Sequence, residues 1–122
     1  MRFRPLTNTE VVFSVTVEEE CFEHVEGNAM SSGDDAADKA CEKEILDRLH
    51  RGDSYAWCCI TVEATWKGYK GGASLGCCSL LGESQVEPTI IDHGMRDEAL
   101  EDLNNRLSKS LEELSERVEV DA

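Results

Sequence analysis

The alternation of residues 55–66 constrains the fold more than any other feature of the chain. Every second residue from Cys58 to Trp66 is apolar, so these side chains share one face of an extended segment. A period of two is typical of a β-strand that is buried on one side. The glycine-rich residues 67–73 follow directly, and we predict that they form a hairpin loop leading into a return strand over residues 74–81.

Two helices are predicted from apolar residues that recur every three or four positions. The first begins at Ser32 or Asp34, either of which can cap it, and runs to about Arg51. The second runs from about Met95 to Val118, and at 1.5 Å per residue it would be roughly 36 Å long. A compact domain barely covers that length, so the helix overhangs the sheet or continues its apolar stripe into a partner subunit.

Two further segments complete the predicted sheet. Residues 10–18 alternate as residues 55–66 do, and residues 88–91 are predicted as a short edge strand, where proline is tolerated. The predicted fold class is therefore α+β, a small antiparallel-dominated sheet of three or four strands with two helices packed on one face, in the order β-α-β-β-(β)-α. With 122 residues, of which 40% are hydrophobic, we expect a single domain over residues 1–122.

The second strong feature is charge. The chain has 26 acidic and 12 basic residues, a formal charge of −14, and the excess is concentrated in residues 18–47 and 92–121. Such a surface repels nucleic acid phosphates and anionic lipids alike, which disfavours direct binding to nucleic acid or membranes. No apolar signal region and no run of about 18 apolar residues is visible, so we expect a cytoplasmic protein.

Like-charged pairs recur four residues apart on the second predicted helix, with Cβ atoms about 5–6 Å from each other. This interval is close to the spacing of phosphates along one nucleic acid strand, so such a helix can imitate a phosphate backbone. We therefore predict a basic protein partner, such as a nucleic-acid-binding complex of a host, while an acid-rich helix that serves solubility alone is the alternative. The candidate partner-binding surface consists of Glu18, Glu19, Glu20, Asp34, Asp35, Asp38, Asp97, Glu98, Glu101, Asp102, Glu112, Glu113 and Glu116.

The six cysteines and three histidines form no recognisable catalytic or metal-binding motif. Adjacent residues on a strand point to opposite faces, so neither the pair at 58–59 nor the pair at 77–78 can hold one ion together. If the hairpin turns within residues 67–73, the two pairs also lie at different heights on the sheet. We predict reduced thiols packed as small hydrophobic groups, with no metal site, no cofactor and no enzymatic activity. A cysteine nucleophile with His93 as its base is the weakest alternative.

Several stretches together resemble small uncharacterised proteins of bacteriophages and prophage-like mobile elements. The resemblance covers about residues 9–107 and rests on four segments, residues 28–35, residues 45–49 with Gly52 and Asp53, residues 56–58, and residues 75–79. Leu80 departs from the aromatic residue expected after Ser79. The resemblance implies no catalytic residue, but it implies a context, because small acidic proteins of mobile elements often block host machinery.

Two functions therefore stand ahead of the enzyme. The first is a non-enzymatic inhibitor of host defence in the host cytoplasm, of the anti-CRISPR or anti-restriction type that imitates the charge of DNA. The second is a structural or scaffold module that forms a homodimer through residues 95–118.

Overall fold

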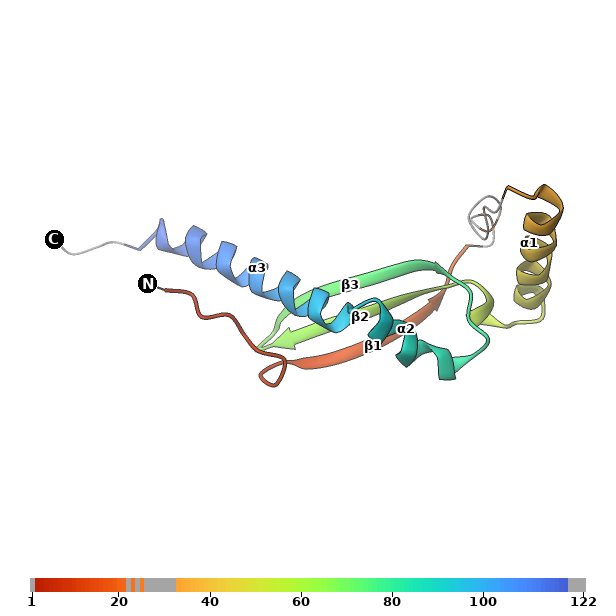
Figure 1. Cartoon of the computed structure of the whole chain (residues 1–122). Coiled ribbons are helices and arrows are strands. Elements are labelled where there is room, and N and C mark those ends of the chain that lie inside the picture. Colours follow the sequence, from red (N-terminus) through yellow and green to blue (C-terminus); the bar gives the residue numbers. More distant parts are fainter. Residues whose placement is uncertain (1, 22, 24, 26–32, 119–122) are drawn as a thin grey trace. The chain divides into compact units, whose positions relative to one another are not determined.

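The computed structural model describes residues 2–21, 23, 25 and 33–118, and its elements are shown in Figure 1. The predicted α+β class is confirmed, with three antiparallel strands in the order β1-β2-β3. The elements in chain order are β1 (Val12–Glu19), α1 (Asp35–His50), the short 3-10 helix η2 (Ser54–Ala56), β2 (Cys58–Trp66), β3 (Tyr69–Cys78), the 3-10 helix η3 (Glu83–Gln85), α2 (Val86–Asp92) and α3 (Met95–Ser115).

The chain divides into two compact units. The terminal unit consists of Met1–Ser14, Val62–Ala73 and Gly94–Ala122, and the central unit consists of Val15–Thr61 and Ser74–His93. Each strand contributes residues to both units. The single domain over residues 1–122 stays a prediction.

The hairpin between β2 and β3 was predicted, but its loop is shorter than residues 67–73. Lys67 and Gly68 both have positive φ, of 46° and 84°, which is the conformation of a two-residue type I′ turn. The turn matches the twist of the flanking strands, so pairing resumes at once at Tyr69. In the central unit the hydroxyl oxygens of Thr61 and Ser74 lie 3.2 Å apart across the two strands.

This register corrects the prediction about the cysteine pairs. Counting along both strands from the contact between Thr61 and Ser74 brings the pair at 58–59 level with the pair at 77–78, not to a different height. The prediction failed because it assumed a loop over residues 67–73. That loop would have shifted the return strand by several residues relative to β2.

Helix α1 begins where its cap predicted. The Asp34 side chain accepts hydrogen bonds from the backbone N–H groups of Ala36 and Ala37, whereas the alternative cap, Ser32, lies outside the described residues. Only the second half of the helix is well buried. Its Ile45 and Leu49 form a cluster with Val25, Ala56 and Trp57, on which Cys41 and Leu46 pack.

The predicted edge strand at residues 88–91 is wrong, since these residues belong to helix α2. Pro88 is the third residue of that helix, where backbone N–H groups have no partner within the helix and the missing donor costs nothing. Val86 and Ile90, four residues apart, are its buried residues.

Helix α3 confirms the long second helix, although it ends at Ser115 and not at Val118. Its first turns are anchored in the terminal unit through the buried Met95, Ala99 and Leu103. At Gly71 of β3 the strand lies directly against the helix backbone, because a Cβ atom there would fall 2.2 Å from the backbone nitrogen of Leu103.

Burial decreases along the rest of α3. Leu107 and Leu111 are half-buried, and the side chain of Leu114 is 62% exposed. Among the described residues, no helix is long and apolar enough to cross a membrane.

Candidate functional site

The predicted acidic residues at the end of β1 have two different roles. Glu18 and Glu19 are exposed, and among the described residues neither side chain has an ion-pair or hydrogen-bond partner. Glu20 is turned inward instead, and its Oε1 accepts a hydrogen bond from the backbone N–H of Cys77 at 3.1 Å. Glu20 therefore supports the end of β3. Of these three residues, only Glu18 and Glu19 are available to a partner.

The acidic group at the start of α1 serves the helix in part. Asp34 is the cap, while Asp35 and Asp38 lie in the first turn, where negative charge is stabilised by the helix dipole. Asp35 is exposed and Asp38 is half-buried. Helix capping thus explains much of this cluster, and Asp35 is the member presented most openly to solvent.

The acidic residues of α3 also divide by role. Asp97, Glu98 and Glu101 are exposed near the helix start, and the exposed residues Glu112, Glu113 and Glu116 follow at the other end. Asp102 lies between the two groups and is engaged within the chain. Its Oδ2 accepts hydrogen bonds from the backbone N–H of Gly72 at 2.8 Å and from Nε of Arg106 at 3.0 Å.

The thirteen predicted residues are thus shared between the units, six in the central unit and seven in the terminal unit. The net charge is shared less evenly. The central unit has fifteen acidic and four basic residues, a formal charge of −11, whereas the terminal unit has eleven acidic and eight basic residues, a formal charge of −3. The central unit is therefore the acidic part of the chain.

Three thiols of the central unit, those of Cys58, Cys77 and Cys78, are poorly suited to nucleophilic catalysis. Burial, followed by the nearby Cys78 and Glu20, raises the pKa of the Cys58 thiol to about 11. The pKa values of the Cys77 and Cys78 thiols are also raised, in each case chiefly by desolvation. Because the thiolate is the reactive form, these three cysteines are almost wholly protonated at neutral pH.

The histidines add no catalytic partner to these thiols in the described part of the chain. His93 contacts the carbonyl of Thr89 through Nδ1 at 3.0 Å, and His50 is exposed. The third histidine, His24, lies outside the described residues. Among residues 2–21, 23, 25 and 33–118, no three or more histidine, cysteine or acidic side chains are placed to hold a metal ion.

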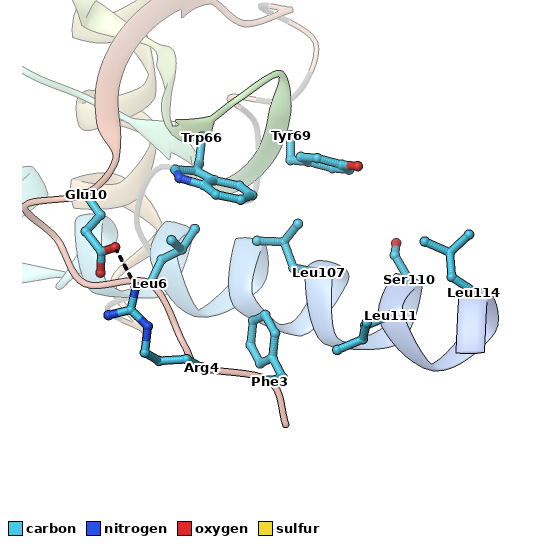
Figure 2. Close-up of a pocket in the computed structure, with 10 residues that line it drawn as sticks. All are labelled: Phe3, Arg4, Leu6, Glu10, Trp66, Tyr69, Leu107, Ser110, Leu111 and Leu114. Atoms are coloured by element: carbon cyan, nitrogen blue, oxygen red, sulfur yellow. Dashed lines mark hydrogen bonds and ion pairs between the residues drawn. The ribbon is translucent and has the colours of Figure 1, made fainter. Parts of the chain in front are cut away.

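An apolar groove that the sequence reasoning missed lies in the terminal unit (Figure 2). It has a volume of about 360 Å³, near the lower end of the range of about 300–1,000 Å³ that is usual for ligand pockets. Figure 2 shows Leu107, Ser110 and Leu114 on the side of α3 that faces two aromatic rings. The residues that line the groove are Phe3, Arg4, Leu6, Glu10, Trp66, Tyr69, Leu107, Ser110, Leu111 and Leu114.

One wall of the groove is the N-terminal segment, which α3 holds in place. The Asn104 side chain accepts a hydrogen bond from the N–H of Leu6 at 2.8 Å and donates one to the carbonyl of the same residue at 3.1 Å. Glu10 closes the following turn by accepting from the backbone and hydroxyl of Thr7, and these bonds, with the nearby Arg4, lower the pKa of its carboxyl group.

The other wall is the tip of the β2–β3 hairpin. The rings of Trp66 and Tyr69 stack with centroids 6.1 Å apart, and the ammonium group of Lys67 lies 5.0 Å from the indole centroid. Beside this wall a second hollow is lined by basic side chains, those of Lys70, Arg106 and Lys109, together with Glu113. The signal in the sequence that could have identified this wall is the pair of aromatic residues, Trp66 and Tyr69, on either side of residues 67 and 68.

Comparison of the chain with protein-family models, with curated proteins and with solved structures finds no significant match.

Proposed function

We propose that the chain is a non-enzymatic binding protein whose acidic central unit engages the basic surface of a nucleic-acid-handling protein. The observation that carries this proposal is the formal charge of −11 on the central unit, with exposed carboxylates such as Glu18 and Glu19 that have no partner among the described residues. Like charge at this density opposes folding, so it indicates a use in binding.

The contacts within the chain narrow the surface that was predicted from sequence. Glu20 and Asp102 support β3, and Asp34 caps α1, so substitution of these residues would disturb the fold as well as binding. Of the residues predicted from sequence, Glu18, Glu19 and Asp35 are exposed in the central unit without capping a helix or supporting a strand, so they are the best candidates for contact with a partner.

Electrostatic attraction of this kind acts mainly on the rate of association. A field of one sign draws an oppositely charged partner from a distance, and salt weakens it over a Debye length of about 8–10 Å. The expected partner is a protein with a groove of lysine and arginine side chains that ordinarily holds phosphates. The resemblance to phage proteins supports a host target in the cytoplasm, such as a CRISPR or restriction complex, which the chain would inhibit by imitating DNA.

The experiment that tests the proposal is capture of partners from bacterial lysate at low and then moderate salt, with three immobilised baits. The first bait is the wild-type chain. The second carries Glu18→Lys, Glu19→Lys and Asp35→Lys in the central unit, and the third carries Asp97→Lys, Glu98→Lys and Glu101→Lys in the terminal unit. The third bait is a matched control, because it changes the net charge equally.

The central variant should lose about tenfold or more in affinity for the captured protein, since three exposed ion pairs of about 0.2–1 kcal/mol each become repulsive. The control should lose less. If all three baits bind the captured protein equally well at low salt, the acidic surface is not used for binding. If the two variants lose the same affinity, only the net charge of the chain matters.

A further inference from the structure

We propose that the open edge of β1 in the central unit binds an extended basic segment of another protein, which joins the sheet as a further antiparallel strand. This inference rests on the function proposed above, because it names the part of a basic partner that the central unit binds and the way it is bound. Three features of the central unit support it, namely unpaired backbone groups along β1, a hollow beside them, and the sign of the charges around both.

One edge of β1 is open. In the described part of the chain β2 is the only strand paired with β1, so the other side of β1 is an edge of the sheet. Glu20 donates its N–H to the carbonyl of Trp57, and in an antiparallel ladder every second residue faces the same neighbour. The N–H and C=O groups of Val15, Val17 and Glu19 therefore point away from β2, where they can pair with an added strand.

This edge lacks the features with which proteins usually prevent strand pairing. Natural edge strands are protected by lysine, by proline, by a bulge or by a covering element. Residues 15–19 contain no lysine and no proline, and none of them has a positive φ. In the terminal unit, by contrast, Asp102 accepts a hydrogen bond from the N–H of Gly72 on the other edge strand, β3. The edge of β1 is therefore the better place for an added strand.

A hollow of about 450 Å³ lies beside the open edge. Val15 and Val17 are two positions apart, so their side chains share one face of β1, and both line the hollow. An added strand sends every second side chain into this hollow, which gives specificity while the backbone gives affinity. Val15 is 41% exposed, so apolar side chains in the hollow cover a surface that is now in contact with water. The other lining residues are Tyr55, Glu83, Val86 and Glu87.

The charges around the edge favour a basic segment. The charged residues that line the hollow are Glu83 and Glu87, and both are exposed. On the opposite face of β1, the exposed Glu18 lies beside the path of the added strand. A segment with apolar side chains towards the hollow, and with lysine or arginine at its ends and on the other face, suits both sides. A second copy of β1 fits badly, because it ends in two glutamates and belongs to a unit with a formal charge of −11.

The first test measures the binding of capped nine-residue peptides to the full chain by isothermal titration calorimetry at low salt. The parent peptide alternates arginine with valine. Methylation of the backbone nitrogens of its two central valines should weaken binding at least about tenfold, because in antiparallel pairing the residues that face the hollow also donate to β1. Methylation of two neighbouring arginines is the matched control. It should change the Kd by less than about twofold, since those N–H groups point away from β1.

The second test alters the edge itself. Val15→Pro removes one N–H from the open side of β1, where proline is tolerated, so the ladder with β2 is kept. Val15→Ala is the matched control, because it shortens the same side chain but keeps the N–H. The proline variant should bind the parent peptide about fivefold more weakly than the alanine variant, and circular dichroism checks that both are folded. If the proline variant does not fold, the methylated peptides still decide the question.

The outcomes separate this inference from the function on which it rests. Equal binding of the two methylated peptides overturns strand addition but leaves the basic partner in place. A peptide that alternates glutamate with valine should bind at least about 100-fold more weakly than the parent. If it binds equally well, the basic partner is wrong. Sedimentation of the chain alone should find no dimer that the parent peptide dissociates, because such a dimer assigns the edge to a second copy and overturns the proposal.

Discussion

The two units of the chain use acidic residues in different ways. In the terminal unit acids are balanced by bases at eleven to eight, and Asp102 joins β3 to α3 through Gly72 and Arg106. In the central unit acids outnumber bases fifteen to four, and Glu18 and Glu19 are left open to solvent. Both units use some acids to hold elements together, as Asp102 does in the terminal unit and Glu20 and Asp34 do in the central unit, but only the central unit carries a large excess of negative charge beyond them.

The comparison also separates two kinds of surface. The terminal unit has an apolar groove with mixed charges around it, which suits an interface that buries area. The central unit has an excess of one sign, which suits rapid and salt-sensitive association. The following predictions test this contrast, beginning with the largest expected effect.

Packing between strand and helix should dominate the stability of the terminal unit. Gly71→Ala should reduce the free energy of unfolding by about 3 kcal/mol, because the added Cβ would lie 2.2 Å from the backbone nitrogen of Leu103 and a backbone cannot move aside cheaply. Gly72→Ala is the control, since its Cβ would meet only the carbonyl of Val62 at 3.6 Å. Urea unfolding measures both, and equal losses would contradict the close approach.

The buried thiol of Cys58 should make the central unit sensitive to alkali. Its pKa is about 11 in the folded chain against 9.0 for the free group, so the unfolded chain loses the proton first as the pH rises. Stability is unaffected below about pH 9 and should decrease between pH 9 and 11 by about 2–3 kcal/mol, at about 1.4 kcal/mol per pKa unit.

Comparison of wild type with Cys58→Ala isolates this effect. The variant should lose stability less steeply over that range when thermal unfolding is followed at each pH, although it starts from a lower value because a side chain is missing from the core. Parallel curves for the two proteins would show that another group is responsible.

The internal role of Asp102 should be visible in stability and not only in binding. Asp102→Ala should cost about 1–2 kcal/mol, since it leaves the Gly72 N–H without its acceptor and removes the contact with Arg106. The exposed neighbour Glu101, changed to alanine, should alter stability by no more than about 0.5 kcal/mol. If urea unfolding showed a larger loss of stability for Glu101→Ala than for Asp102→Ala, the distinction between structural acids and acids exposed for binding would be wrong.

The smallest effect is expected from the open carboxylates of the central unit. Glu18→Gln with Glu19→Gln should raise stability by about 0.5 kcal/mol at low salt, because self-repulsion falls. The gain should disappear at about 1 M salt, where the Debye length is about 3 Å. A loss of stability at low salt would show that these side chains have partners in the folded chain.

Local patterns were sufficient to predict most elements of this fold. The alternation of β2, the stripe of α3 and the cap at Asp34 each depend on neighbours within a few residues, and each is present in the structure. The helix at Pro88 was missed because proline in a first turn resembles proline at a strand edge when the sequence is viewed alone.

The errors with longer range have a common origin. Three glycines at 68, 71 and 72 indicated a long loop, but only Gly68 serves the turn, while Gly71 is required by a helix about thirty residues further along the chain. The groove was hidden for the same reason, because its N-terminal wall is held by a contact between Leu6 and Asn104, which lie 98 positions apart. Repeats of two or of three to four residues carry no information about contacts between residues so far apart in the sequence. The residues predicted to bind a partner remain a prediction, apart from those now found engaged within the chain.

The contact at Gly71 also offers a way to recognise distant relatives. Any homologue that keeps this arrangement needs a residue without a side chain at that place, three positions after the glycine of the turn. The geometric signature is therefore a tryptophan, any residue, a glycine, two further residues and a second glycine, followed by an amphipathic helix whose contact residue lies about thirty positions after that second glycine. Such a signature can persist after overall similarity has faded.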